Sequence, residues 1–442
     1  MSRSAFVIAL LLLSLTGSAA GRGLAGSCRT ISVTRTSASF PHLRSLQAAV
    51  DSARPCDWIL ISPGVYPGSV TIKTPELHLR GLDRNLTIID GGHRAGNGIT
   101  IEADDVSIEN LTVRNFDRSS INDDDTGNEV RWLSVHGWEA RYLTVYDTGL
   151  LGGYGLWASR SRDGVLDQAY ASGFSDSGLY VGACRDCHAL IQHATAEHNL
   201  IGLAATNASG HIVIEHSLFL DNAVGVSLNS SLSDPPPPQF GSCNAGRNRS
   251  LAPKVATTRL ARCTVFRHNR VIANNALDTP SETASVRPGA GIGIELLGTA
   301  ADLIANNIIR GNRNIGVLEL PLPEIGVSRF PVAGNRISSN RIGGSRLAIA
   351  LAGTNGSVDN CVQGNTNGPT EPTDLNAYSC TRATTPHPPA PSNRRVETLV
   401  NRLHAQLVSH PRHGEPAPAP QPTMRTPCRD APPNPLCATR TH

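Results

Sequence analysis

Residues 177 to 210, SGLYVGACRDCHALIQHATAEHNLIGLAATNASG, contain two copies of one short unit. Each copy begins with a glycine and an apolar residue, at Gly178-Leu179 and again 24 residues later at Gly202-Leu203. The same unit recurs at Gly98-Ile99, Gly155-Leu156, Gly225-Val226, Gly293-Ile294 and Gly316-Val317. Two shorter apolar runs and two turns lie between consecutive glycines. Three short strands in a coil of about 23 residues are typical of a β-helix and not of a leucine-rich or helical repeat.

Two columns of polar residues repeat in the same register. The first column holds Asn110, Gln168, His193, His216, Asn306 and Asn360, and the second holds Asn115, Asp147, Asn199, Asn222, Asn312 and Asn365. Equivalent residues in successive coils lie about 4.8 Å apart, so inward amides can hydrogen-bond along a ladder. We expect His193 and His216 to replace ladder amides. A metal between His188 and His211, which are also 23 residues apart, stays as an alternative.

The N-terminus resembles a secretory signal. Arg3 precedes an apolar run over residues 6–15, and small residues follow up to Ala20, where cleavage is expected. A lipoprotein would use Cys28, which lies far beyond the apolar run. No later apolar run reaches 18 residues, so we expect an exported chain with no membrane span.

The ends of the solenoid differ from its middle. Apolar residues at helical spacing over residues 40–53 predict a short helix, with Ser39 as its N-cap, that closes the first coil. We therefore assign residues 1–20 to a signal peptide, 28–57 to an N-terminal strand and capping helix, and 58–380 to the β-helix. Residues 381–442 form a proline-rich tail.

The tail composition predicts an extended, mobile linker with one helix over residues 393–409. That helix would cap the last coil or pack along the side of the solenoid. A second proline-rich segment, residues 235–250, interrupts the repeat and predicts a long loop.

Charge and cysteine usage narrow the class of protein. The net charge is +3 and no basic tract occurs, which argues against nucleic acid as a partner. The ten cysteines form local pairs: Cys28/Cys56, Cys184/Cys187, Cys243/Cys263, Cys361/Cys380 and Cys428/Cys437. In an exported chain these pairs predict disulfides, although proximity alone does not fix the connectivity. Zinc or redox chemistry at Cys184 and Cys187 is the alternative.

Two segments resemble a known superfamily. SLQAAVDSARPCDWILISPGVYPG, residues 45–68, resembles the opening of secreted pectin-lyase-like proteins, and residues 177–210 resemble a bacterial branch of that superfamily without assigned activity. The resemblance covers roughly residues 28–380. It implies an all-β, single-stranded right-handed parallel β-helix. It implies no reaction, because lyases, hydrolases, esterases, epimerases and non-catalytic proteins share this scaffold.

The catalytic signatures of those enzymes are missing from the sequence. Arg329-Phe330-Pro331 begins like a pectate-lyase-like motif, but Gly334 stands where the second arginine belongs. Gly210-His211-Ile212 departs from the Gly-His-Gly of polygalacturonases. The sequence therefore leaves the question of catalysis open.

The candidate binding residues are Arg131, Trp157 and Tyr180. The residue after each unit's glycine is apolar and inward, so Trp157 and Tyr180 point outward one above the other, and Arg131 falls near the equivalent place one coil earlier. Two exposed aromatic rings beside a guanidinium would form a platform for a sugar with a carboxylate. Ordinary stacking between neighbouring strands is the alternative.

A run of carboxylates provides weak catalytic candidates. Asp123, Asp124 and Asp125 lie in a loop that we expect to overhang the same face, and Arg185 is an additional charged neighbour. Such a cluster suits general acid/base work or calcium, whereas a solvated acidic turn is more common. No other cofactor or metal is indicated.

The leading hypothesis is an extracellular β-helix protein that binds an acidic, uronate-containing polysaccharide and acts on it as a lyase or epimerase if it is an enzyme. One alternative is a non-catalytic surface or adhesion protein. Another is an exported metal-handling protein, since a copper-maturation factor shares this architecture. The sequence fixes neither the substrate nor the oligomeric state.

Overall fold

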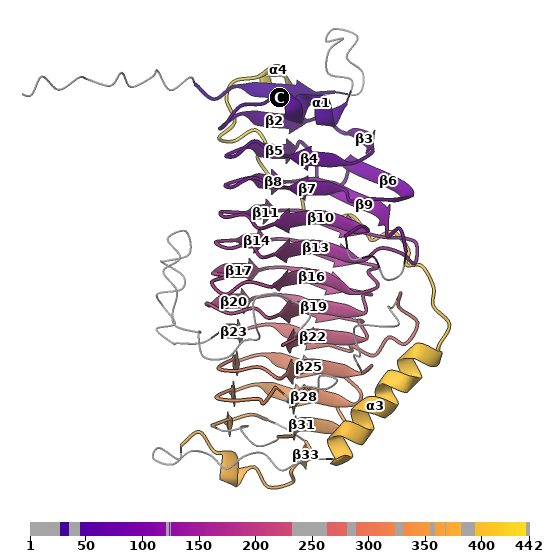
Figure 1. Ribbon diagram of the computed structural model, residues 1–442, viewed down its shortest axis with the longest axis vertical. Helices are drawn as coiled ribbons and strands as arrows, with labels where there is room; N and C mark the ends of the chain where they lie inside the picture. The colour runs from indigo at the N-terminus through magenta and orange to yellow at the C-terminus, as the bar shows by residue number, and fades with distance from the viewer. Residues whose placement is uncertain are drawn as a thin grey trace, which may run out of the picture.

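The computed structural model describes residues 27–34, 45–120, 123, 125–231, 263–280, 289–322, 330–353, 359–366, 368–381 and 394–438. The predicted signal peptide, Ser39, Asp124 and the loop at 235–250 lie outside these residues. Over the described residues the chain winds into a solenoid of three long parallel sheets, which we name A, B and C (Figure 1). This is the all-β parallel helix that the glycine repeat predicts.

Each complete coil contributes one strand to each sheet, and the first and last turns are incomplete among the described residues. Sheet A contains β1 (Thr30–Val33), β2 (Trp58–Ile61), β5 (His78–Gly81), β8 (Ser107–Glu109), β11 (Glu139–Arg141), β14 (Val165–Asp167), β17 (Ala189–Gln192), β20 (Ile212–Glu215), β23 (Thr264–Arg267), β26 (Leu303–Ala305), β29 (Arg336–Ser338) and β32 (Cys361–Gln363). Sheet B contains β3 (Gly64–Pro67), β6 (Thr87–Ala95), β9 (Thr112–Asp117), β12 (Thr144–Tyr146), β15 (Tyr170–Ser172), β18 (Thr195–Glu197), β21 (Leu218–Leu220), β24 (Arg270–Ile272), β27 (Ile308–Arg310) and β30 (Arg341–Gly343). Sheet C contains β4 (Val70–Ile72), β7 (Ile99–Ile101), β10 (Asn128–Leu133), β13 (Tyr154–Ser159), β16 (Ser177–Gly182), β19 (Ile201–Thr206), β22 (Val224–Asn229), β25 (Ile292–Leu297), β28 (Ile315–Leu320), β31 (Leu347–Leu351) and β33 (Thr370–Glu371).

The glycines of the repeat stack at the corner where sheet B leads into sheet C. Leu156, Leu179 and Leu203, which each follow a repeat glycine, pair in register on β13, β16 and β19. A Cβ atom on Gly178 would lie 2.7 Å from the Nδ2 atom of Asn199. Glycine is required here because the amide at the same corner of the next coil fills the space that a side chain would need.

Buried asparagines form two ladders: one follows the predicted second column, and the other lies one residue after the predicted first column and includes Asn365, which the repeat predicts in the second column. At the corner between sheets B and C, the amides of Asn199, Asn222, Asn274 and Asn312 are linked by side-chain hydrogen bonds of 2.9–3.0 Å. A second ladder at the corner between sheets A and B joins Asn307, Asn340 and Asn365. Each amide satisfies a neighbour in the next coil, so the ladders keep buried polar groups paired along the solenoid.

The expected place of two histidines in such a ladder is wrong. His193, His216 and His268 occupy the left-handed turn residue just before the ladder position, with φ values of 52–56°. Their rings stack outside the core with centroids 5.8 and 5.5 Å apart, and 46% of the His193 side chain is exposed. The side chain of the turn residue points outward, and the side chain of the next residue points inward. The column of stacked histidines and the asparagine ladder are therefore one residue apart in the sequence.

The N-terminal cap is shorter than predicted. Helix α1 (Leu46–Asp51) has Ser45 as its N-cap, and Leu46, Ala49 and Val50 are buried in the core at the first coils. The other helical elements are the short turns η1 (Asn376–Tyr378) and α4 (Pro435–Ala438) and the long helix α3 (Arg394–Ser409). No helix among the described residues is long and apolar enough to cross a membrane.

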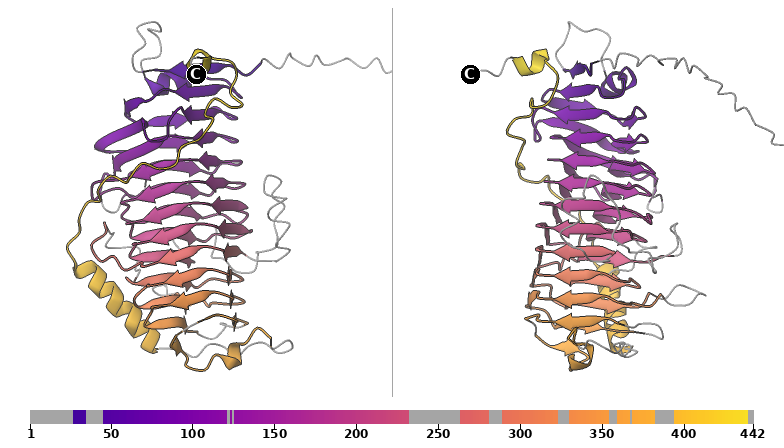
Figure 2. Two further views of the ribbon diagram at one scale, coloured as in Figure 1. Left: turned by 180° about the vertical axis from the view of Figure 1, so that it is seen from behind. Right: turned by 90° about the vertical axis from the view of Figure 1, so that its left-hand side faces the viewer.

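Helix α3 packs along the side of the solenoid rather than over its last coil. Val396, Leu403 and Leu407 are buried against apolar residues on the outer face of sheet C. Figures 1 and 2 show α3 lying obliquely beside the lower strands of that sheet. The apolar stripe predicted from the sequence is therefore the face that contacts the sheet.

The proline-rich tail is extended but it contacts the solenoid along its length, in contrast to the mobile linker that its composition predicts. The backbone N–H of His413 donates to the carbonyl oxygen of Asp278, and the carbonyl oxygen of Pro422 accepts from Arg84. Further on, the carbonyl oxygens of Pro427 and Arg429 accept from Arg80. Figure 2 shows the tail running back toward the N-terminal coils.

Four of the predicted disulfides are present: Cys28–Cys56, Cys184–Cys187, Cys361–Cys380 and Cys428–Cys437. Cys243, the expected partner of Cys263, lies outside the described residues. The Cys184–Cys187 disulfide removes the two thiols that a zinc site would need.

Candidate functional site

The three candidate binding residues lie on adjacent strands of sheet C. Arg131 on β10 pairs with Trp157 on β13, which pairs with Tyr180 on β16. All three point outward, because their neighbours Val130, Leu156 and Leu179 belong to the buried core. The spatial alignment is the one that the repeat predicts.

The side chains nevertheless form a packed cluster and not an open platform. Tyr180 is only 5% exposed, and Trp157 is partly buried against Tyr154 and Tyr180, with ring centroids 5.7 and 6.1 Å away. The expectation of an exposed Tyr180 is thus wrong, because neighbouring aromatic rings cover it. The three rings pack against one another across the neighbouring strands β13 and β16.

The guanidinium of Arg131 is occupied by the neighbouring loop. Its carbon lies 4.8 Å above the centroid of the Trp157 ring. Its terminal nitrogens donate to the backbone oxygen and the Oδ1 atom of Asp125, at 2.8 and 3.1 Å, and 12% of the side chain is exposed. A carboxylate ligand at Arg131 would have to displace Asp125.

The carboxylates of that loop mostly serve the loop itself. Asp123 accepts hydrogen bonds from Ser119 and Thr126, and these bonds hold the pKa of its carboxyl below the usual range. Asp125 is highly exposed and contacts Arg131. Asp123 and Asp125 thus both have partners in or next to the loop.

Arg185 lies away from the acidic loop. It sits in the disulfide-closed turn after β16, whereas the loop precedes β10 at the other edge of sheet C. Strand β16 is six residues long, so the two edges of the sheet lie about 17–20 Å apart. Arg185 and the aspartates therefore do not form one site.

Sequence reasoning missed a buried acidic corner beside this face. Glu129 is fully buried, and burial and the nearby charge of Asp147 raise the pKa of its carboxyl well above the usual range. Burial also raises the pKa of Asp147 to about 6. The sequence does carry one signal of this buried corner, since Glu129 occupies the position that glycine occupies in most other coils.

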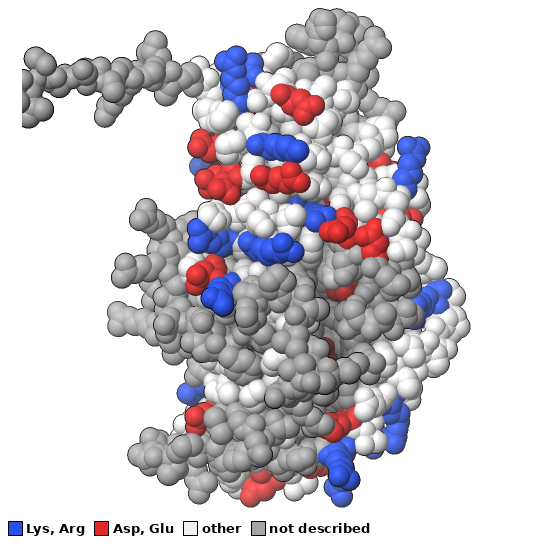
Figure 3. All heavy atoms as spheres, viewed as in Figure 1, with Lys and Arg blue, Asp and Glu red and all other residues white. Residues whose placement is uncertain are grey.

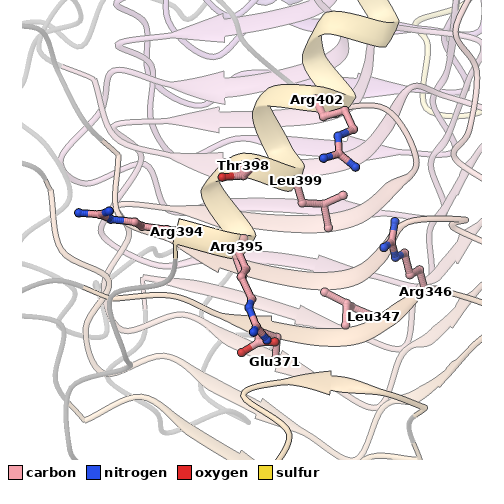
Figure 4. A pocket seen from close by; sticks show the side chains of 9 residues that line it. Arg346, Leu347, Glu371, Arg394, Arg395, Thr398, Leu399 and Arg402 are labelled. Atoms are coloured by element: carbon pink, nitrogen blue, oxygen red, sulfur yellow. The ribbon is translucent and has the colours of Figure 1, made fainter.

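A pocket of about 440 Å³ lies between helix α3 and the last coils of sheet C. Four arginines line it, Arg346 before β31 and Arg394, Arg395 and Arg402 on α3, together with one carboxylate, Glu371. Figure 4 shows Arg395 reaching toward Glu371, and Arg346 and Arg402 beside Leu347 and Leu399. Sequence analysis did not find this pocket because its two sides are far apart in the chain.

Other charged surfaces are balanced. On sheet A, Arg80 pairs with Glu109, Arg141 with Asp167, and Arg267 with Glu215, at 2.5–3.1 Å. Figure 3 shows basic and acidic side chains interleaved over the N-terminal coils on the face that it presents. The surplus of arginines at α3 therefore differs from the balanced charges of sheet A.

Comparison with known proteins supports the fold. No protein-family model and no curated protein sequence matches the chain. Among solved structures, the catalytic domain of an α-1,3-glucanase in complex with tetrasaccharides matches with a TM-score of 0.51 and 12% identity, over 84% of this chain and 69% of that chain. The mannuronan C-5 epimerase A-module of Azotobacter vinelandii matches with a TM-score of 0.45 and 16% identity, over 72% of this chain and 89% of that one. Together with the three parallel sheets, the match to the glucanase shows that the chain has a right-handed parallel β-helix fold.

Proposed function

We propose that this protein is an exported β-helix protein that binds an acidic polysaccharide, with the arginine-lined pocket beside helix α3 holding the carboxylates of the glycan. The sequence predicts export through its N-terminal signal, and the disulfides fit an oxidising compartment. The glucanase with the same fold was solved with tetrasaccharides, so this scaffold accommodates carbohydrate.

The surplus of positive charge in the pocket carries this proposal. All four arginines, Arg346, Arg394, Arg395 and Arg402, are exposed, and among the described residues that line the pocket only Glu371 is acidic. Guanidinium groups gathered without equal counter-charge repel one another, so an anion that enters the pocket is stabilised. Arginine also binds carboxylates through two parallel hydrogen bonds.

The floor of the pocket suits a sugar rather than a small inorganic anion. Leu347 and Leu399 contribute apolar surface between the arginines. A uronate ring presents apolar C–H groups on one face and a carboxylate at its edge. Contact with both kinds of surface would favour acidic over neutral glycans and extended glycans over free anions.

The proposal specifies binding without a reaction. Asp123 is hydrogen-bonded within its own loop, and Arg131 is bound by Asp125. Arg131 and Trp157 remain a second proposed contact for the glycan, which a ligand could reach only by displacing Asp125. A non-catalytic role at a cell surface or matrix is compatible with the same pocket.

Calorimetric titration of the full-length protein with oligogalacturonate, and with dextran as a neutral glycan, tests the proposal. We expect saturable binding of the oligogalacturonate alone, weakened at least tenfold in the double variant Arg346→Ala/Arg402→Ala. The matched control is Arg270→Ala/Arg341→Ala, which removes two exposed arginines from strands β24 and β30 of sheet B. Equal binding in the two double variants would contradict the proposal.

A further inference from the structure

A histidine and two aspartates from three consecutive coils meet at the corner between sheets B and C. His93 lies on β6, Asp117 ends β9 and Asp147 follows β12. The Nδ1 atom of His93 lies 3.2 Å from Oδ1 of Asp117 and 3.5 Å from Oδ1 of Asp147. From this arrangement we infer that the corner is a binding site for a divalent cation of the zinc class.

The hydrogen bonds around His93 fix which ring nitrogen carries a proton. The hydroxyl of Thr148 donates to Oδ1 of Asn115 at 3.0 Å, and the same oxygen accepts the backbone N–H of Thr148. Nε2 of His93 lies 3.1 Å from that hydroxyl. Since the hydroxyl has given its proton away, it accepts from Nε2, and Nε2 carries a hydrogen.

Nδ1 is then the ring atom that faces the two carboxylate oxygens. Three electronegative atoms that face one another need a proton or a metal ion between them. An orienting hydrogen bond on the opposite ring nitrogen is also how metal-bound histidines are usually held. Thr148 would fill that orienting role here.

The space between these groups is kept free by two glycines. A Cβ atom on Gly149 would lie 3.0 Å from Nδ1 of His93, and one on Gly152 would lie 2.6 Å from Oδ2 of Asp147. The backbone N–H groups of both glycines donate to the Asp147 carboxylate, at 3.2 and 2.8 Å. Asp147 is thus fixed in place, with its side chain fully buried.

A second buried carboxyl group, that of Glu129, lies next to this corner. Oε2 of Glu129 has no hydrogen-bond partner among the described residues, although the side chain is fully buried. Arg114 is the cation bound to Asp90, at 2.7 Å. A divalent ion would supply charge that this group of carboxylates needs.

The distances favour a small ion over calcium. The three candidate ligand atoms all lie within 4.8 Å of one another. For bonds of about 2.1 Å, the ligands of a tetrahedral ion are about 3.4 Å apart, close to the two distances from His93. Calcium takes six to eight oxygen ligands at longer distances and does not prefer imidazole. One histidine with two carboxylates therefore fits zinc or a similar transition-metal ion.

The test is zinc binding to the full-length protein after dialysis against a chelator, measured by calorimetry and by elemental analysis after gel filtration. We expect one zinc ion per chain at this site, with affinity reduced at least tenfold by His93→Ala and by Asp117→Asn. Removal of the orienting hydroxyl in Thr148→Val should weaken binding about tenfold. Calcium should compete poorly.

The matched control is His136→Ala, because His136 is also a half-exposed histidine beside an aspartate, with Nδ1 3.9 Å from Asp104. This variant should bind zinc like the unmodified protein. Zinc affinity that is the same in His93→Ala and in the unmodified protein, or no zinc binding at all, would overturn the inference. Glycan binding at α3 does not depend on this site, so the two proposals can fail separately.

Discussion

Glu129 lies opposite Gly155 on the neighbouring strand, in the column that glycine fills in most other coils. The pairs Asn128 with Tyr154 and Val130 with Leu156 on either side fix this relationship. The glycine column exists because the corner of the next coil leaves no room for a side chain. At Glu129 a carboxyl group stands in this column instead, and it is fully buried.

Buried carboxylates make the stability of the solenoid depend on pH. Burial raises the pKa of Glu319 to about 8 and that of Glu295 to about 7, from 4.5 in an exposed chain. Between pH 4.5 and the raised pKa, each of these two carboxyl groups carries a proton in the folded state that it has lost in the unfolded state. The free energy of unfolding should therefore fall as pH rises from about 4.5 to 8.

The variant Glu319→Gln should remove part of this slope. At about 1.4 kcal/mol per pKa unit, the difference across the range is at most roughly 5 kcal/mol for this group. Urea unfolding at several pH values measures it, with Glu102→Gln as an exposed control paired to Lys73. An unchanged slope in Glu319→Gln would show that this carboxyl does not titrate as its burial implies.

Trp157→Ala should destabilise the protein, because the ring packs between Arg131, Tyr154 and Tyr180. Removing a fully buried tryptophan ring lowers the free energy of unfolding by about 3–5 kcal/mol. Because Trp157 is only partly buried, we expect a loss of about 2–3 kcal/mol. Chemical denaturation measures the change, with the exposed Leu150→Ala as the control. If the variant is as stable as the unmodified protein but binds glycan more weakly, the open binding platform predicted from the sequence would be the better interpretation.

The docked tail should stabilise the N-terminal coils. Arg84 is 1% exposed, and its guanidinium donates to Pro422, Leu143 and Thr144. Deletion of residues 411–442 removes the Pro422 carbonyl and leaves a buried donor without its partner, at a cost of about 1–3 kcal/mol. Differential scanning calorimetry should show a lower melting temperature. No change would mean that the tail does not dock in solution.

The sequence predicted the solenoid, the register of its strands and four disulfides, because each follows from local spacing. The histidine column was misplaced because the outward turn residue and the inward ladder residue, such as His268 and Asn269, are adjacent in the chain. Spacing alone does not tell which of the two points inward.

The docking of the tail and the arginine pocket were beyond sequence reasoning for a different reason. A proline-rich composition predicts extended backbone, but it does not specify which carbonyls meet Arg80 and Arg84. Likewise, Arg346 and Arg402 gain their shared function only through the packing of α3 on sheet C. Tertiary contacts between distant segments decide both features.

Hydrogen–deuterium exchange of the full-length protein, with and without saturating oligogalacturonate, tests the proposed glycan site most directly. Peptides that cover residues 346–351 and 394–402 should gain protection when the glycan binds, because the ligand holds α3 against the last coils. Saturable binding without protection in these two segments, or with protection confined to residues 128–133 and 154–159, would contradict the account.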